Sequence, residues 1–182
     1  MACIDDEELA QMLRIVRANG WDRNLKTHQQ NKLRAEHDIS SEFEAKYAFY
    51  DLGYNLRPTE ITGFLGLFQM QFLDDNISVR QKNHARLAKT SAVNDHLISI
   101  THNHISFLSP FAFPVIAKTP ELRRKYVDIF SQAGIEIRPM IAGNIQRQPF
   151  YRKYVKESYD LPGAEFLHHH SFYCGNYPEL TE

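Results

Sequence analysis

The sequence predicts a soluble protein of mixed α and β structure, with helices in its first half and alternating strands and helices in its second. Three observations lead to this prediction. An amphipathic helical pattern begins near residue 5, a strongly apolar helical stretch follows residue 58, and a strand, helix and strand occupy residues 111–138. With 182 residues, 43% of them hydrophobic, the chain can bury one substantial core.

The composition argues against several classes of protein. Lys and Arg total 21 against 22 for Asp and Glu, so the net charge of -1 gives no reason to expect nucleic acid or a membrane surface as a partner. Cys3 and Cys174 are too few for a disulfide framework or a Cys-rich metal site, and they fit a cytoplasmic location. No apolar stretch is long enough to cross a membrane. Residues 1–4 resemble the end of a buried strand, so we expect the chain to begin partway through a longer protein.

The first predicted element is a helix that starts at a capping box. Asp5, with Glu8 three residues later, forms this box, apolar residues then recur at helical spacing, and Gly20 ends the helix. Residues 22–44 are polar without sustained periodicity. They predict a long excursion over the surface, helical in part over 40–46.

A buried helix is predicted to follow a turn in the middle of the chain. Residues 47–52 are rich in aromatic side chains and predict a short extended segment that leads into this turn. Pro58 suits the first turn of a helix, and residues 61–73 are apolar on almost every side. We therefore expect this helix to be deeply buried, with Gly63 and Gly66 favouring close packing against another helix.

The second half of the chain alternates between element types. A polar helical pattern predicts a long connecting helix, after which turn residues separate short strands from two further helices. One face of the second helix, made of Leu122, Tyr126, Ile129 and Phe130, is expected to cover a short sheet. The predicted order is helix 77–96, strand 111–117, helix 120–132 ended by Gly134, strand 135–138 and helix 164–170.

The first candidate binding segment runs from Gly53 to Glu60, just before the apolar helix. It carries Asn55 and Arg57. A guanidinium beside the unpaired N–H groups of a helix start suits an anion such as a phosphate. A turn or cap role for Asn55 and an ion pair between Arg57 and Glu60 explain the same residues, and these alternatives stay open.

The second candidate binding segment is the loop 143–151, which follows the last predicted strand. Asn144, Gln146 and Arg147 supply neutral and cationic donors of the kind that recognise a sugar or a nucleotide, although an ordinary solvated loop explains the same polarity. The run His168–His170 predicts no metal site. Consecutive side chains on a helix point about 100° apart and cannot all bind one ion.

Three blocks of the sequence resemble a known family. Residues 5–20, the block Gly53-Tyr54-Asn55-Leu56-Arg57-Pro58-Thr59-Glu60 and residues 134–139 are similar to the carboxy-terminal part of the DegT/DnrJ/EryC1/StrS family. These are pyridoxal phosphate (PLP)-dependent enzymes that act mostly on nucleotide-linked keto sugars. The resemblance implies the α/β fold of aspartate aminotransferase (fold type I), here as a large-domain remnant at 1–76, a connecting helix and linker at 77–104, and a small α+β domain at 105–182 that is truncated at its last helix.

Within the family, two blocks are similar to a narrower subgroup. Residues 143–149 and 172–181 resemble lipopolysaccharide 3-dehydrases that act on CDP-4-keto-6-deoxyglucose, and some sugar aminotransferases carry similar blocks. The resemblance implies an aminotransferase of polysaccharide or lipopolysaccharide sugar biosynthesis. A 3-dehydrase of the same family, and a non-catalytic split subunit that completes a homologue's active site, are the alternatives.

The resemblance also implies roles for the candidate residues. Family members are usually dimers, in which Asn55 and Arg57 would contact the PLP phosphate or the substrate of the partner subunit. Asn144, Gln146 and Arg147 would face a nucleotide-sugar substrate. The catalytic lysine of the aminotransferases, or histidine of the dehydrases, belongs to a segment before residue 3, so no catalytic residue is expected in this chain. The expected protein partner is a second copy or a full-length homologue.

Overall fold

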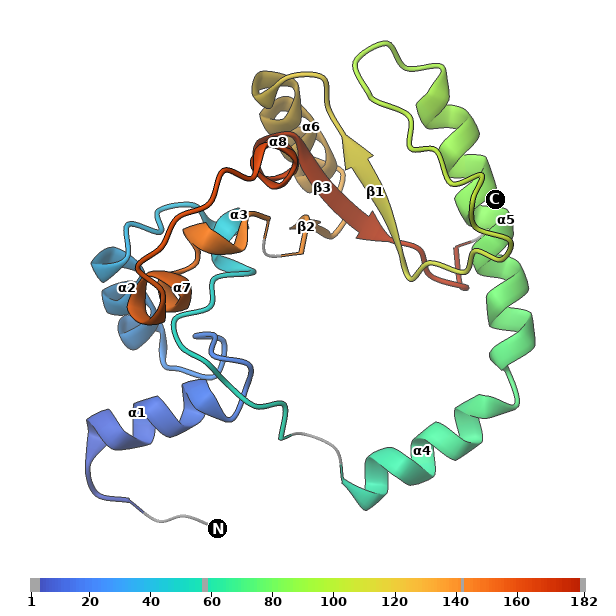
Figure 1. The fold of residues 1–182 in the computed structure, drawn as a ribbon. Coiled ribbons are helices and arrows are strands. Elements are labelled where there is room, and N and C mark those ends of the chain that lie inside the picture. The colour runs from blue at the N-terminus through green and yellow to red at the C-terminus, as the bar shows by residue number, and fades with distance from the viewer. Residues whose placement is uncertain (1–3, 57–58, 142, 181–182) are drawn as a thin grey trace. The chain divides into compact units, whose positions relative to one another are not determined.

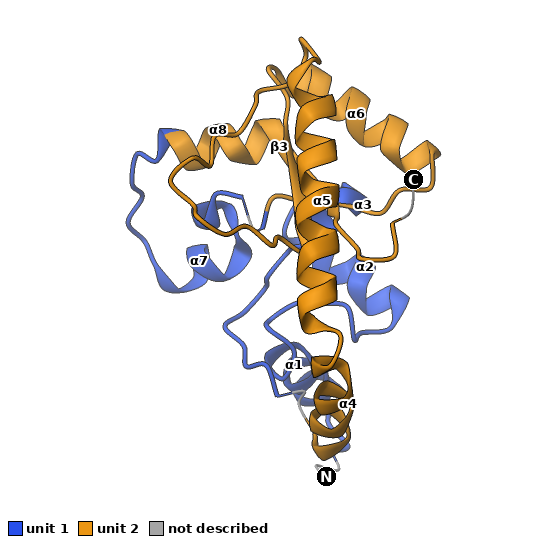
Figure 2. Ribbon diagram, turned by 90° about the vertical axis from the view of Figure 1, so that its right-hand side faces the viewer, with its two compact units in different colours: residues 1–58, 141–162 blue, residues 59–140, 163–182 orange. Residues whose placement is uncertain are grey.

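The computed structural model describes residues 4–56, 59–141 and 143–180, and the chain divides into two compact units (Figure 2). Residues 1–58 and 141–162 make up the first unit, and residues 59–140 and 163–182 make up the second. The chain thus enters each unit twice. The domain boundaries at residues 76 and 104 that the family resemblance implies stay a prediction.

The first unit opens with α1 (Glu7–Val16), which confirms the first predicted helix (Figure 1). Its cap is Asp6 and not the predicted Asp5. Asp6 has the extended backbone of an N-cap residue, and its Oδ1 accepts a hydrogen bond of 2.9 Å from the N–H of Leu9.

Two more helices interrupt the polar stretch that follows. One was expected in part over residues 40–46 and is α3 (Glu42–Ala45), but α2 (Thr27–Glu36) was not predicted. Its side chains lack an apolar stripe, and long-range polar contacts hold it in place. Arg34 Nε donates to Asp22 Oδ2 at 2.7 Å. The first unit is completed by residues 145–154, which form the 3-10 helix η1 (Ile145–Arg147) and α7 (Pro149–Tyr154).

The second unit contains a three-stranded antiparallel sheet with the strand order β1-β3-β2 (Figure 1). β3 lies between the other two strands, and its Phe172 pairs with Val115 on one side and Pro139 on the other. Phe172, Ile137 and Ala117 are almost completely buried and form the centre of the core. The strands are β1 (Ala112–Ile116), β2 (Ile137–Pro139) and β3 (Ser171–Gly175), of which the first two were predicted.

One predicted helix packs on this sheet. α6 (Pro120–Gln132) starts at Thr119, whose side chain accepts from the N–H of Leu122 at 3.2 Å, and it ends before Gly134 at a φ of 72°. The ring of Phe130 meets that of Phe172 edge to face, with 5.4 Å between centroids. The prediction of this helix is confirmed, and Phe130 of its predicted face covers the sheet, but Ile129 of the same face is 45% exposed. α8 (Pro162–His170), also predicted, leads directly into β3.

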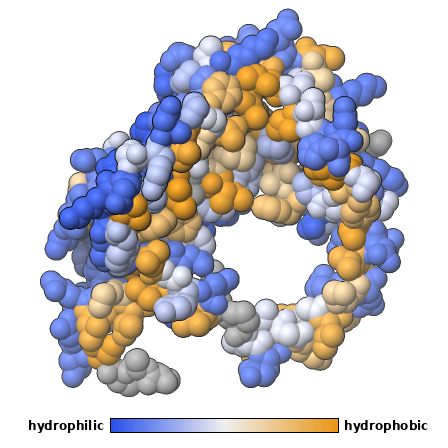
Figure 3. Space-filling view, in the orientation of Figure 1, coloured by the Kyte–Doolittle hydropathy of each residue, from blue (hydrophilic) through white to orange (hydrophobic). Residues whose placement is uncertain are grey.

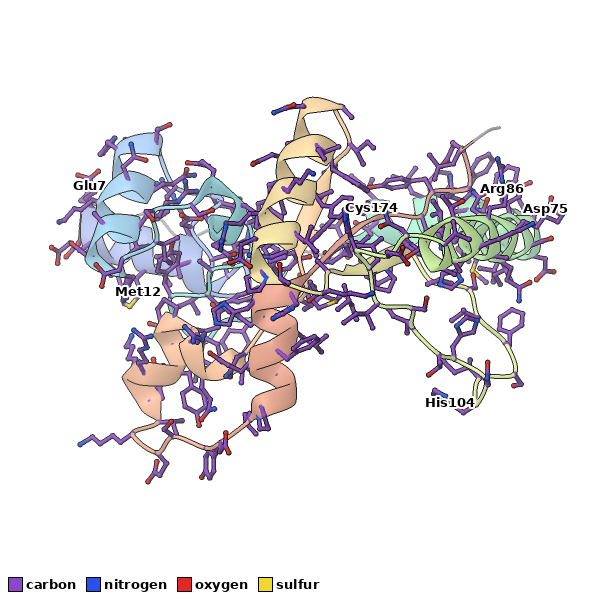
Figure 4. The ribbon with its side chains drawn as sticks, turned by 90° about the horizontal axis from the view of Figure 1, so that it is seen from above. Glu7, Met12, Asp75, Arg86, His104 and Cys174 are labelled. Carbon is purple, nitrogen blue, oxygen red and sulfur yellow. The ribbon has the colours of Figure 1, made fainter. Side chains whose placement is uncertain are left out.

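The long helix α5 (Leu73–Ala92), marked by Asp75 and Arg86 in Figure 4, confirms the predicted helix. It lies within the second unit, and its role as a connector between domains stays a prediction. Residues after β3 attach to it. Asn83 Nδ2 donates to the carbonyl oxygen of Tyr177 at 3.1 Å, and Asn176 Nδ2 donates to that of Arg80 at 3.0 Å. These amide bonds fasten the helix to the end of the sheet.

The helix that was predicted to be deeply buried is exposed. α4 (Glu60–Met70) has no buried residue, and Ile61, Phe64 and Leu67 are 72%, 73% and 78% exposed. Hydrophobic atoms reach the surface along it (Figure 3). A Cβ added at Gly63 or Gly66 would meet no described atom within 4 Å, so the expected close helix packing does not occur within the described chain. No helix in the described ranges has the length and apolar character needed to cross a membrane.

Candidate functional site

The backbone that carries Asn55 is held against the end of α1. The N–H of Tyr54 donates to the carbonyl oxygen of Val16 at 2.7 Å, and the N–H of Asn19 donates to that of Tyr54 at 3.0 Å. Ala18 and Asn55 form an antiparallel bridge. The backbone of Asn55 is therefore fixed while its side chain stays exposed, an arrangement that suits contact with an external ligand.

Two glycines allow this close approach of the chain to itself. Gly20 has a φ of 83°, and a Cβ on it would lie 1.8 Å from the carbonyl oxygen of Asp51. A Cβ on Gly53 would lie 2.3 Å from the backbone nitrogen of Gly20. No side chain fits at either position without moving the backbone, so the pairing that presents Asn55 depends on both glycines.

The structure describes only part of the remainder of the first candidate segment. Arg57 and Pro58 lie outside the described residues, so the predicted role of Arg57 stays a prediction. α4 begins beyond them in the second unit, at Glu60, and its N-cap residue is Thr59. Its side chain accepts from the N–H of Thr62 at 3.3 Å, and Thr62 Oγ1 accepts from the N–H of Thr59 at 3.4 Å.

In the second candidate segment, two of the three predicted residues stabilise the loop. The side chain of Asn144 is buried, and its Oδ1 accepts from the N–H of Gln146 at 3.1 Å. Gln146 uses both ends of its amide on the backbone of Tyr159, at 2.9 and 2.6 Å. Arg147 is exposed at the surface. The loop therefore presents Arg147 from a rigid base.

The part of the chain that carries Asn55 and the second candidate segment belong to the first unit and are joined by hydrogen bonds. The N–H of Phe49 donates to Gln148 Oε1 at 3.1 Å, and the N–H of Phe150 donates back to the carbonyl oxygen of Phe49 at 3.1 Å. Two residues on, the carboxylate of Asp51 accepts from Lys153 and from a tyrosine hydroxyl on α7. Residues 49–51, just before the Asn55 turn, are thus held by hydrogen bonds against the segment that follows Arg147.

The contacts of Asp51 also determine its ionisation. Partial burial disfavours the charged carboxylate, but the hydrogen bonds from Lys153 and Tyr154 outweigh burial and lower the pKa of Asp51. The same contact raises the pKa of Lys153. Both groups are therefore held in their charged forms at the join between the two segments.

The first unit contains a buried polar network that the sequence did not predict. Asp22 is completely buried, and its Oδ2 accepts from Arg34 Nε and, at 3.4 Å, from the hydroxyl of Tyr50. Its Oδ1 has no hydrogen-bond partner among the described atoms. Burial, followed by the nearby charge of Asp22, raises the pKa of Tyr50. The three residues are separated by 12 to 28 positions, so no local spacing could have revealed them.

Metal binding finds no support in the described part of the chain. None of its His, Cys, Asp and Glu side chains gather in a group of three that could hold an ion. His169 instead faces Glu165 one turn away on α8, with 3.3 Å between Nε2 and Oε1.

Comparison with known families identifies the family and the fold of this chain. The family model for the DegT/DnrJ/EryC1/StrS aminotransferase family matches residues 1–182. The chain belongs to this family. The fold class expected from the sequence, that of the PLP-dependent aminotransferases, is thereby confirmed.

The most similar relatives include GDP-4-keto-6-deoxy-D-mannose 3-dehydratases. That of Yersinia pseudotuberculosis is 34% identical over 185 residues, and that of Escherichia coli O55:H7 is 32% identical over 177 residues. The matches cover 98% and 95% of this chain but only 45% and 44% of the relatives. This DegT-family chain thus spans less than half the length of the curated relatives it matches. A lipopolysaccharide biosynthesis protein of Salmonella typhimurium is 29% identical over 144 residues.

Solved structures also match nearly all of this chain but less than half of their own length. The E. coli 3-dehydratase with bound hydrated PLP matches at a TM-score of 0.59 and 32% identity, over 96% of this chain and 44% of that one. A mutant GDP-4-keto-6-deoxymannose-3-dehydratase with bound GDP-perosamine matches at a TM-score of 0.59 and 31% identity, over 96% of this chain and 45% of that one. A Helicobacter pylori aminotransferase of pseudoaminic acid biosynthesis has a TM-score of 0.59 at 18% identity, over 98% of this chain and 43% of that one, and this likeness concerns the fold alone.

Proposed function

We propose that this DegT-family chain is part of a PLP-dependent nucleotide-sugar 3-dehydratase that acts on a GDP-linked 4-keto-6-deoxy sugar. The observation that carries the proposal is its identity of 32–34% to two 3-dehydratases of that specificity, whereas four solved aminotransferases of similar fold are 15–20% identical. The sequence led first to an aminotransferase, with the dehydrase as an alternative. The comparisons favour the alternative.

One described residue supports the proposed binding of the phosphate end of PLP. Asn55 has an exposed amide on a fixed backbone, and such an amide can donate to a phosphate oxygen. The buried carboxylate of Asp22 is closed off by Arg34 and Tyr50, so it is not available to the pyridine ring. When bound, PLP supplies the electron sink for chemistry at the sugar. In the proposal, Asn55 and Arg57 hold its phosphate.

The substrate-binding part of the proposal rests on the loop of Arg147. Asn144 and Gln146, proposed earlier as direct contacts, are engaged within the loop and would shape it. Arg147 would then meet the phosphates or the sugar, because a guanidinium binds phosphate through a fixed pair of N–H donors. Its exposure is compatible with this role.

The proposed protein partner is a second copy of the chain or a full-length homologue. The exposed apolar side chains of α4 support this part of the proposal, since contiguous apolar surface of this kind marks an interaction site. In such a complex Asn55 and Arg57 would complete the partner's site. The proposed location is the cytoplasm, which fits the free, buried thiol of Cys174 (Figure 4).

A product assay tests the proposed reaction. The chain is coexpressed with the portion of the Yersinia pseudotuberculosis relative that it does not match, and the purified complex is given GDP-4-keto-6-deoxy-D-mannose, PLP and glutamate. Mass spectrometry should detect a nucleotide sugar that has lost one oxygen atom. A 4-amino sugar would instead establish the aminotransferase. No product from the complex would overturn the proposed reaction and support the non-catalytic subunit.

A further inference from the structure

Four side chains of the first unit form a stacked group at its surface. The ring of Trp21 stacks on that of Phe49, with 6.0 Å between centroids and 19° between planes, and the ring of Tyr47 lies 6.2 Å from Phe49. The guanidinium carbon of Arg23 lies 3.8 Å from the centre of the Trp21 ring and 5.4 Å from that of Tyr47. We call Trp21, Arg23, Tyr47 and Phe49 the aromatic platform.

The aromatic platform is positioned by the backbone and remains accessible. Arg23 Nη2 donates to the carbonyl oxygen of Lys46, which holds the guanidinium over the rings. The three rings are half-buried and Arg23 is exposed, so the group is not part of the hydrophobic core. Aromatic rings and guanidinium planes are the surfaces on which proteins stack nucleic-acid bases, with little dependence on which base is present.

The platform is built on the same backbone that presents the candidate site. The carbonyl oxygen of Gly20, next to Trp21, accepts from the N–H of Tyr50 at 2.7 Å, within the pairing that fixes Asn55. The N–H of Phe49 meets Gln148, beside Arg147. Asn55 lies six positions after Phe49, which limits the distance between them to about 20 Å even in a fully extended chain.

We infer that the aromatic platform binds the base of a nucleoside diphosphate, and so forms the base subsite of the nucleotide sugar. The identity of the ligand rests on the proposed function, whereas the stacking surface rests on the rings and the guanidinium alone. Arg23 would lie against the face of the base. The diphosphate would extend toward the exposed donors of Arg147 and Asn55.

Tryptophan fluorescence gives a direct test with the 182-residue protein. Trp21 is the sole tryptophan of the chain, so its emission reports on the platform and nothing else. GDP is titrated with excitation at the red edge of the indole band, and free N-acetyltryptophanamide corrects for absorption by guanine. Saturable quenching of Trp21 is the expected result.

Substitutions in the platform should weaken GDP binding. Tyr47→Leu leaves the charge of the protein unchanged and should raise the apparent dissociation constant about fivefold or more, since a stacked aromatic contributes this much per base. Arg23→Gln gives an independent variant if Tyr47→Leu fails to fold. The matched control is Arg152→Gln, at an exposed position of the same unit outside the platform, which should bind GDP as the unchanged chain does. Circular dichroism checks that each variant is folded.

Equilibrium dialysis with GDP separates this inference from the proposed function. Two results would overturn the platform as a base subsite: GDP is retained in dialysis without a change in Trp21 fluorescence, or Tyr47→Leu and Arg23→Gln bind GDP as tightly as the unchanged chain. Either result would leave the dehydratase proposal unaffected. Absence of GDP binding would overturn the base subsite as well. The dehydratase proposal is judged separately, by the product of the coexpressed complex.

Discussion

The N–H of Phe49 donates a hydrogen bond of 3.1 Å to Oε1 of Gln148, although the two residues are 99 positions apart. Gln148 is 8% exposed and Phe49 is half-buried, so this bond is partly shielded from water. It joins the aromatic stretch that precedes the Asn55 turn to the loop that presents Arg147. The two segments recognised in the sequence as rich in donors are thus parts of one structure, and Gln148 connects them.

Replacing Gln148 with leucine should destabilise the chain. The substitution keeps the size of the side chain but leaves the N–H of Phe49 without its acceptor, and an unsatisfied buried donor costs about 1–3 kcal/mol. Urea unfolding followed by circular dichroism measures the loss. Gln132→Leu, at an exposed position at the end of α6, is the matched control and should change stability by less than about 0.5 kcal/mol. Equal stability of the two variants would contradict the role of Gln148.

Gly20→Ala should be still more damaging. The new Cβ would lie 1.8 Å from the carbonyl oxygen of Asp51, and the φ of 83° adds the left-handed strain of about 1–2 kcal/mol that any L side chain carries there. We expect a loss of at least about 2 kcal/mol in the free energy of unfolding. Gly66→Ala, in the open middle of α4, should instead stabilise the isolated chain by up to about 1 kcal/mol. A Gly20→Ala variant as stable as the unchanged chain would show that the backbone pairing around Asn55 is different.

Arg34→Leu should destabilise the first unit by leaving the carboxylate of Asp22 buried and unpaired. We expect a loss of about 3 kcal/mol, the lower end of the range for a broken buried pair, because the Arg34 side chain keeps 17% exposure. The double variant Asp22→Asn, Arg34→Leu should recover part of the loss, since no buried charge remains. Arg124→Leu removes an exposed pair with Glu121 and should leave stability nearly unchanged in the same urea titration. No recovery in the double variant would argue against the charge as the cause.

The parts of the fold that the sequence predicted are those with local signals. Thr119 and Gly134 mark the ends of α6 by their own chemistry, and the predicted bounds of this helix agree with the structure. α2 lacked such a signal, because the ion pair of Arg34 with Asp22 is a contact between distant residues. The predicted burial of α4 failed for a related reason. An apolar pattern shows that a surface needs cover, but not whether the same chain supplies it.

The candidate site could be predicted to a similar extent. Donor-rich turns are visible in sequence, so Asn55 and Arg147 were recognised as candidates and the structure leaves both exposed. Gln146 has a similar donor, but its amide donates to the carbonyl oxygen of Tyr159 and accepts from the N–H of the same residue. The stacking of Trp21 on Phe49 joins positions 28 residues apart and depends on the pairing at Gly20, so no local pattern indicates it.

The acid sensitivity of the second unit should depend on His84. Its ring lies 5.4 Å from those of His102 and Phe113, and burial, followed by the charge of His102, lowers its pKa below the ordinary 6.5. The unfolded chain therefore binds a proton at His84 before the folded chain does. Stability is fully present above about pH 6.5 and falls as the pH drops toward the folded pKa, by at most about 1.4 kcal/mol per pH unit.

Substitution by phenylalanine should remove this contribution. His84→Phe keeps a ring against Phe113 but cannot bind a proton, so the free energy of unfolding should fall less steeply below about pH 6.5 than in the unchanged chain. Urea titrations at several pH values measure the slope. His28→Phe, at an exposed position on α2, is the matched control and should keep the slope of the unchanged chain. If His84→Phe and the unchanged chain lost stability in parallel, the proton would be taken up elsewhere, and the contact of His84 with His102 would not govern the acid limit of this unit.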